Sequence, residues 1–123
     1  MSKAMNHNVE YRNFDPTERI NSLIESLITK LEKRARNFAP DAVFLRISIE
    51  ENQARTLYHA SITLDVPGKT LATKDERHEL EAGIKGAFAQ IEGQLQEHKA
   101  RLRGEHLRNR NSRREIRILR AAG

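Results

Sequence analysis

The chain end from Lys99 onward is rich in arginine and lysine, the residues here whose type and spacing best suit chemistry with anions. Its nine basic residues face only Glu105 and Glu115, a net charge of +7. Residues 1–98 hold 13 basic and 15 acidic groups, net −2, which leaves +5 overall. Eight of the nine cations are arginines, whose planar guanidinium suits phosphate oxygens and stacks on bases. The charge distribution favours a polyanion partner, nucleic acid first. A solvated tail that only aids solubility is the alternative.

Two more groups of cations fall on predicted helices. The first crowds the last turns of the first helix: Lys30, Lys33, Arg34 and Arg36. These residues would also interact with the negative end of the helix dipole, at about 0.3–1 kcal/mol each, which is compatible with phosphate contact. The second group shares an exposed stripe of the last helix: Arg77, Lys85, Lys99 and Arg103. We expect Glu81 to pair with Lys85 one turn later and so to occupy part of this stripe.

Other chemistries find no support in the sequence. The chain has no cysteine, which excludes disulfides, thiolate zinc sites and a cysteine nucleophile. Its five histidines form no metal pair one turn apart, and we interpret His98 as a residue at the edge of the core. The serines lie in no nucleophile elbow and the glycines in no phosphate-binding loop. We therefore predict no enzyme, no cofactor, no metal and no small-molecule substrate.

The chain also offers little for a membrane or for reading base sequence. No apolar stretch approaches the roughly 20 residues of a membrane helix, and the start has no signal-peptide pattern. We therefore expect a cytoplasmic protein without membrane contact. Only six residues are aromatic, and Phe44 and Tyr58 are the plausible surface rings. Recognition of a nucleic acid should then rest on backbone and shape.

The first two predicted elements of the chain are a short strand and a helix. Val9, Tyr11 and Phe14 predict a weak first strand. Asp15 is a suitable N-cap, followed by Pro16 at the first helical position and Glu18 in a capping box. Apolar residues then repeat at helical spacing: Ile20, Leu23, Ile24, Leu27, Ile28 and Leu31. This stripe predicts a helix from about Pro16 to Arg36.

The remaining elements are strands and a second helix. Strict alternation of apolar residues predicts strands over residues 43–50 and 59–66, and Pro67-Gly68 predicts a type II turn before a short strand, 70–73. An apolar face then predicts a helix from about Glu76 to Arg103, with Gly104 as its stop. Residues 105–123 have no dependable period, and we expect a disordered basic tail after a domain of residues 1–104.

The predicted order is β-α-β-β-β-α. This is an α+β sandwich, in which two helices pack on one face of a mostly antiparallel four-stranded sheet.

The residues in this order resemble the ribosome hibernation promoting factor / ribosome-associated translation inhibitor family, in its short form. The resemblance spans roughly Val9 to His106 and rests on an ordered set of segments: Asp15-Pro16-Thr17-Glu18, Lys30-Leu31-Glu32-Lys33, the run from Leu57 to Gly68, and the run from Ala87 to Lys99. The chain departs from the family pattern at Gln90 and Gly93, where basic residues are frequent, and in the stretch from Lys74 to Glu81.

The resemblance implies a fold related to double-stranded-RNA-binding domains. It also implies a partner, the small ribosomal subunit and its rRNA, which such proteins bind in the mRNA/tRNA channel, stopping translation without catalysis. We expect a monomer when free. The candidate rRNA contacts are Lys30, Lys33, Arg34, Arg36, Lys74, Arg77, Lys85, Lys99, Arg101, Arg103, Arg108 and Arg110. The alternative is an adaptor whose basic tail binds an acidic protein surface, or a general binder of free nucleic acid.

Overall fold

Four strands and two helices account for most of the chain. A computed structural model describes the backbone of residues 5–122 and the side chains of residues 5–104. The elements follow in the order β1 (Asn6–Arg12), α1 (Glu18–Arg34), a short 3-10 turn (Pro40–Ala42), β2 (Phe44–Asn52), β3 (Leu57–Val66), β4 (Lys69–Arg77) and α2 (Leu80–Ala122). This α+β order confirms the predicted β-α-β-β-β-α arrangement.

The strands lie in one sheet in the order β1-β2-β3-β4. β1 runs parallel to β2, because α1 crosses over between them, whereas β3 and β4 follow as antiparallel neighbours. The turn between β3 and β4 contains Gly68 at φ +89°, as the predicted type II turn requires. The sheet is therefore mostly antiparallel, as predicted.

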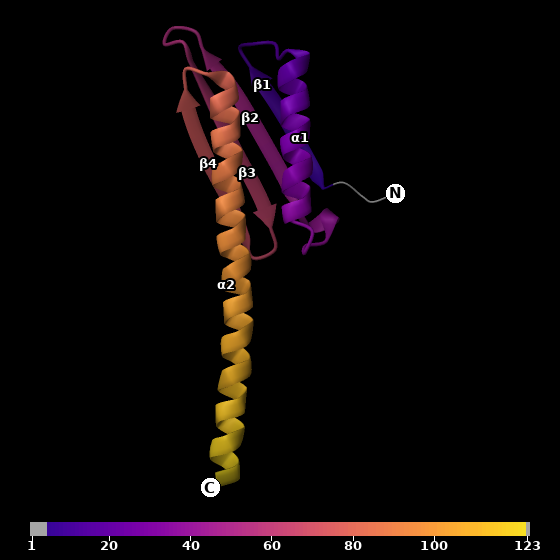
Figure 1. Ribbon diagram of the computed structural model, residues 1–123, viewed down its shortest axis with the longest axis vertical. Helices are drawn as coiled ribbons and strands as arrows, with labels where there is room; N and C mark the ends of the chain where they lie inside the picture. The colour runs from indigo at the N-terminus through magenta and orange to yellow at the C-terminus, as the bar shows by residue number, and fades with distance from the viewer. Residues whose placement is uncertain (1–4, 123) are drawn as a thin grey trace.

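Both helices cover the same face of the sheet (Figure 1). The strands turn their apolar residues toward them: Leu45, Ile47 and Ile49 from β2, Ile62 and Leu64 from β3, and Leu71 from β4. α1 contributes Ile24 and Leu31 to this core, and α2 contributes Phe88, Ile91 and Leu95. The other sheet face, which we call the open face, carries the alternate residues: Glu10, Arg12, Phe44, Arg46, Ser48, Glu50, His59, Ser61, Thr63, Asp65, Lys74 and Glu76.

The start of α1 differs from the prediction by two residues. Thr17, not Asp15, is the N-cap, and its hydroxyl accepts a hydrogen bond from the backbone N–H of Ile20 at 3.3 Å. A threonine hydroxyl fills this role as a carboxylate would, so the preference for Asp15 was wrong although the helix itself is confirmed.

The end of the sheet differs more. β4 continues to Arg77, and α2 begins at Leu80, so the prediction of a helix from Glu76 was wrong. The reason is that Thr73 and Asp75 continue the series of alternate β4 residues that face the core. They pair with Ile62 and Ala60 of β3. A charged run of this kind resembles an exposed helix end in sequence. Lys74 and Arg77 consequently lie on a strand.

α2 also extends farther than predicted. Its backbone continues through Gly104 to Ala122, and Figure 1 shows it projecting well beyond the sheet. The expected helix stop at Gly104 was therefore wrong, whereas the division into a domain of residues 1–104 and a basic tail of residues 105–123 stays a prediction. An internal glycine costs a helix only about 1 kcal/mol, and residues 105–122 contain no proline and six arginines, a residue type that favours helix.

In the described part of the chain, neither helix combines the length and the apolar character that a membrane crossing needs.

Candidate nucleic-acid interface

The end of α1 presents a cluster of cations because the apolar stripe of the helix ends there. Leu31 and Ala35 are buried against the core, which turns the residues between and after them outward. Lys33, Arg34 and Arg36 are all exposed, as is Lys30 one turn earlier. The basic residues predicted at the C-terminal end of the first helix are therefore on the surface.

α2 brings a second set of cations to the same place. The Lys99 ammonium donates a hydrogen bond to the backbone carbonyl of Arg34 at 2.9 Å, which joins the middle of α2 to the end of α1. Arg103 follows one turn later on α2 and is exposed. An ammonium carries three donors, so Lys99 keeps two for other acceptors. We call the set Lys33, Arg34, Arg36, Lys99 and Arg103 the basic end.

His98 helps to hold this junction together. Its ring is buried, lies 6.3 Å from the ring of Phe38 in a stacked arrangement, and its Nε2 lies 3.1 Å from the carbonyl oxygen of Pro67. It therefore ties α2 to the β3–β4 turn and to the segment after α1. This is the core-edge role predicted for His98.

The cations of the basic end lack carboxylate partners. Among residues 5–104, no ion pair involves Lys33, Arg34, Arg36, Lys99 or Arg103. Lys30 lies 4.0 Å from Glu92, and Arg101 pairs with Glu97 at 3.5 Å. The second pair is exposed and the first is partly exposed, and such surface pairs contribute little, about 0–1 kcal/mol. The basic end is therefore a patch of unneutralised positive charge beside two weakly paired cations.

Lys85 lies elsewhere on α2. It is 14 residues before Lys99 and so about 21 Å away along the helix. The expected pair between Glu81 and Lys85 is wrong, because the Glu81 carboxylate instead lies 2.7 Å from Nε of Arg19 on α1. Lys85 is exposed and, within the described residues, has no ion pair.

Arg77 and Lys74 are separated from the basic end by the change from helix to strand. Lys74 lies on the open face. The Arg77 guanidinium pairs with the buried carboxylate of Asp75 at 2.9 Å, and the other oxygen of that carboxylate accepts from Gln90 at 3.2 Å. Arg77 therefore has a structural partner that the sequence did not reveal.

Gly86 shows how tightly this buried pair is packed. A Cβ on Gly86 would lie 2.6 Å from Oδ2 of Asp75 and 3.0 Å from Nη2 of Arg77. α2 can approach β4 this closely only without a side chain there. At Gly93, by contrast, a Cβ would meet nothing within 4 Å.

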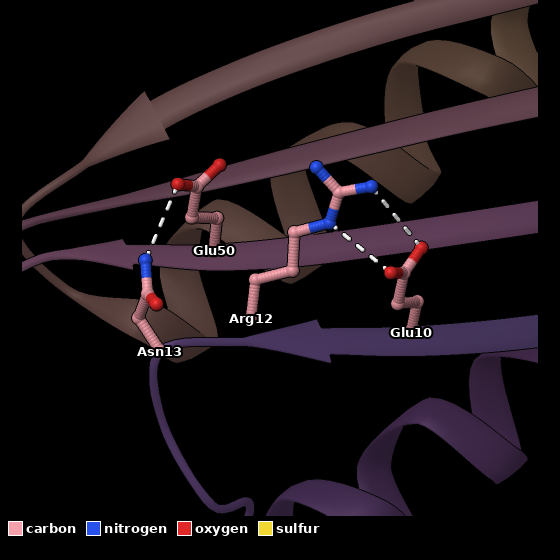
Figure 2. Close-up of polar contacts among 4 residues, drawn as sticks. All are labelled: Glu10, Arg12, Asn13 and Glu50. Carbon is pink, nitrogen blue, oxygen red and sulfur yellow. Dashed lines mark hydrogen bonds and ion pairs between the residues drawn. The ribbon is translucent and has the colours of Figure 1, made fainter.

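On the open face, in contrast, charged side chains lie beside polar or charged partners. Arg46 lies 3.6 Å from Asp65 across two strands, and His59 lies 3.5 Å from Glu76. Arg12 contacts Glu10 at 3.1 Å, and Asn13 donates to Glu50 at 3.4 Å, as Figure 2 shows. The hydrogen bond from Arg12 to Glu10, together with the charge of that carboxylate, raises the pKa of Arg12. Both arginines of this face therefore lie beside a carboxylate.

The two predicted surface rings have different environments. Phe44 is 37% exposed, and the guanidinium of Arg46 lies 5.1 Å from its centroid. Tyr58 is half-buried and packs edge-on against Phe14 at 5.8 Å. Arg108 and Arg110 lie on the helical extension of α2, outside the described side chains.

Comparison with known proteins places this geometry in context. Residues 7–103 match the family model described as "Sigma 54 modulation protein / S30EA ribosomal protein". The N-terminal domain of Protein Y from Thermus thermophilus is 19% identical, with 76% of this chain and 96% of that chain covered and a TM-score of 0.59. A ribosomal subunit interface protein from Coxiella burnetii is 17% identical, with 78% and 99% covered and a TM-score of 0.59. At these identities the likeness shows a shared fold. No curated protein sequence matched.

Proposed function

This chain belongs to the sigma 54 modulation protein / S30EA ribosomal protein family, and from that premise we propose that it binds small-subunit rRNA in the mRNA/tRNA channel and so blocks translation in idle ribosomes. The family is ribosome-associated and of a non-catalytic type, and its members serve ribosome hibernation and translation regulation. The proposed block of translation therefore requires binding to the ribosome and no catalytic step. A ribosomal partner would also place the protein in the cytoplasm, and we propose that it is a monomer when free.

The observation that carries the proposal is the basic end. Five cations from the end of α1, the turn after it and α2 meet there, and within residues 5–104 none forms an ion pair with a carboxylate. Most protein contacts to nucleic-acid backbones come from such side chains and position the protein without reading sequence. We assign the first rRNA contacts to the basic end, with Lys30 and Arg101 able to exchange their weak pairs for phosphate.

The helical extension of α2 supports a second zone of contact. Residues 105–122 would add about 27 Å of helix beyond the domain, and Arg108 and Arg110 lie along its first turns. We propose that these arginines contact phosphates farther along the channel. Lys74, Arg77 and Lys85 remain predicted contacts. We consider Lys85 and Arg77 weaker candidates than the basic end, because Lys85 lies far from it and Arg77 is paired with Asp75.

Binding to purified subunits tests the proposal. The labelled full chain should bind small subunits and not large ones, and log Kobs should fall linearly with log salt concentration, with a slope of about −0.7 to −0.9 per phosphate neutralised. Unchanged affinity between low and moderate salt would refute an electrostatic interface. Affinity for free RNA or DNA equal to that for small subunits would favour the general nucleic-acid binder instead.

Sedimentation of a stationary-phase lysate gives an independent check. The chain should migrate with the small subunits. Recovery only in the soluble fraction would contradict a hibernation role and would favour the adaptor.

A further inference from the structure

A hollow of about 370 Å³ opens beside the end of α1, next to the basic end. Its floor is apolar and belongs to the core, because Met5, Ala35 and Val43 are all buried. Phe38, half-buried, and Pro40, exposed, form its wall. Lys33 and Arg36 stand at its rim together with Glu32 and Thr29.

A second hollow, of about 340 Å³, adjoins the first through a shared residue. Phe38 lines both, and the remaining wall consists of Asn37, Lys99, Leu102 and Arg103. Leu102 is 38% exposed and adds an apolar side chain to this wall. The two hollows therefore follow one another across Phe38, and each carries two cations of the basic end.

The chemistry of these hollows selects among possible ligands. An apolar floor with an aromatic wall suits a flat ring, and the paired cations at each rim suit an anion attached to it. A nucleotide combines both groups, since its base has an apolar face and its phosphate is a polyvalent acceptor. The cations here are already those assigned to the RNA backbone, so the hollow is continuous with the proposed interface.

We propose that the hollow bounded by Met5, Ala35, Phe38, Pro40 and Val43 receives one unstacked base of a single-stranded or looped RNA. Lys33 and Arg36 hold the phosphate of that nucleotide, and Lys99 and Arg103 hold the next phosphate in the second hollow. This inference rests on the proposed function and adds to it a contact with a base. The rRNA would then be recognised by an unpaired nucleotide as well as by its backbone.

Short RNA probes with and without bases test the inference in the full chain. The first probe is an adenylate hexamer, and the second is a hexamer of abasic ribose with the same phosphates. Stacking of a base on a protein surface strengthens binding, so we expect the adenylate hexamer to bind about tenfold more tightly at equal salt. Equal affinity for the two probes would overturn the inference.

A variant that fills the hollow isolates the base contact from the charges. Thr29 lies at the rim and is exposed, and among residues 5–104 its hydroxyl donates only to the helix carbonyl of Glu25. Thr29→Phe should abolish the preference for the adenylate hexamer and leave the affinity for the abasic hexamer within about twofold. Ser26→Phe is the matched control, because Ser26 is also exposed on α1 and bonds to the carbonyl of Leu23 but does not line the hollow. Loss of the preference in both variants would contradict the assignment.

Methyl NMR of the unsubstituted chain keeps the test independent of variant folding. The adenylate hexamer should shift the methyl resonances of Met5, Ala35 and Val43, and the abasic hexamer should not. Absence of these shifts at saturation would refute the base site. Binding to small subunits, measured on the same sample, separates the two proposals: subunit binding without base preference defeats only the inference, and base preference without subunit binding defeats only the proposed function.

Discussion

The basic end and the open face of the sheet both expose several charged side chains, yet they are organised differently. On the open face, Arg12 and Arg46 each lie beside a carboxylate, on the same strand or across the sheet. At the basic end, Lys33, Arg36 and Arg103 form no ion pair within residues 5–104, although Glu32 lies nearby. The two surfaces therefore differ in pairing: both arginines of the open face lie beside a carboxylate, whereas no ion pair forms at the basic end within residues 5–104.

The difference arises from which elements meet. Cross-strand neighbours alternate in a fixed register, so opposite charges placed on adjacent strands meet automatically. The basic end forms where a helix terminus meets the middle of another helix, and the sequence places few acids at either position. The comparison yields predictions that can be ordered by the size of their expected effect.

The largest effect should follow removal of charge from the basic end. Lys33→Gln with Arg36→Gln should weaken binding to small subunits by about 100-fold or more, since each hydrogen bond to a charged group contributes about 1.5–3 kcal/mol. Filter binding at fixed salt measures the affinity, and the salt slope should fall by about two.

The matched control for this pair lies on the open face. Arg12→Gln with Arg46→Gln lowers the net charge by the same two units, and we expect a change in affinity of less than about threefold. Similar losses in the two double variants would show that bulk charge, and not the basic end, determines binding.

The second prediction separates a structural cation from a binding cation. Arg77→Gln should lower the free energy of unfolding by about 1–3 kcal/mol, because it leaves the buried Asp75 carboxylate without its charged partner. Affinity for small subunits should change little. Urea denaturation followed by circular dichroism measures the first effect, and unaltered stability together with a large loss of affinity would reverse the roles assigned to Arg77.

The third prediction concerns the packing around the same pair. Gly93→Ala should stabilise the protein by up to about 1 kcal/mol, the difference in helix propensity. Gly86→Ala should instead destabilise it by about 1 kcal/mol, since overpacking against Asp75 and Arg77 outweighs that gain. Thermal melts of both variants provide the comparison, and stabilisation by both would mean that the Asp75–Arg77 pair yields easily.

The smallest effect should come from an isolated cation. Lys85→Gln removes an exposed charge that has no ion pair among residues 5–104 and lies far from the basic end, and we expect affinity to fall by no more than about threefold. A loss as large as that of the basic-end variant would extend the interface along the whole of α2.

The sequence was sufficient for the core and for the order of the elements. Strict alternation over β2 and β3 and the helical stripe of α1 follow from apolar periodicity, which reflects burial directly. The helix was predicted to begin too early, at Glu76, because charged side chains over residues 74–79 obscure the alternation of β4. Asp75 also places an acid at a buried strand position that is usually apolar. The N-cap was placed wrongly at Asp15 because aspartate and threonine are both residue types that cap helices.

The candidate site was only partly predictable for a related reason. The cations at the close of α1 are adjacent in sequence, but their meeting with Lys99 depends on how α2 packs across the sheet. Likewise, Glu81 pairs with Arg19 over 62 residues, and no local spacing reveals that contact. Pairing between distant elements therefore decides which predicted cations remain available.

The continuity of α2 from Leu80 to Ala122 also affects the thermodynamics of association. Fixing the backbone of a flexible residue costs about 1–2 kcal/mol at 25 °C. An irregular arginine tail would incur that entropic cost upon meeting its partner, residue by residue. In a helix that is continuous with the folded domain, the backbone is already ordered before binding. A smaller loss of conformational entropy then opposes the attraction of its arginines for phosphate.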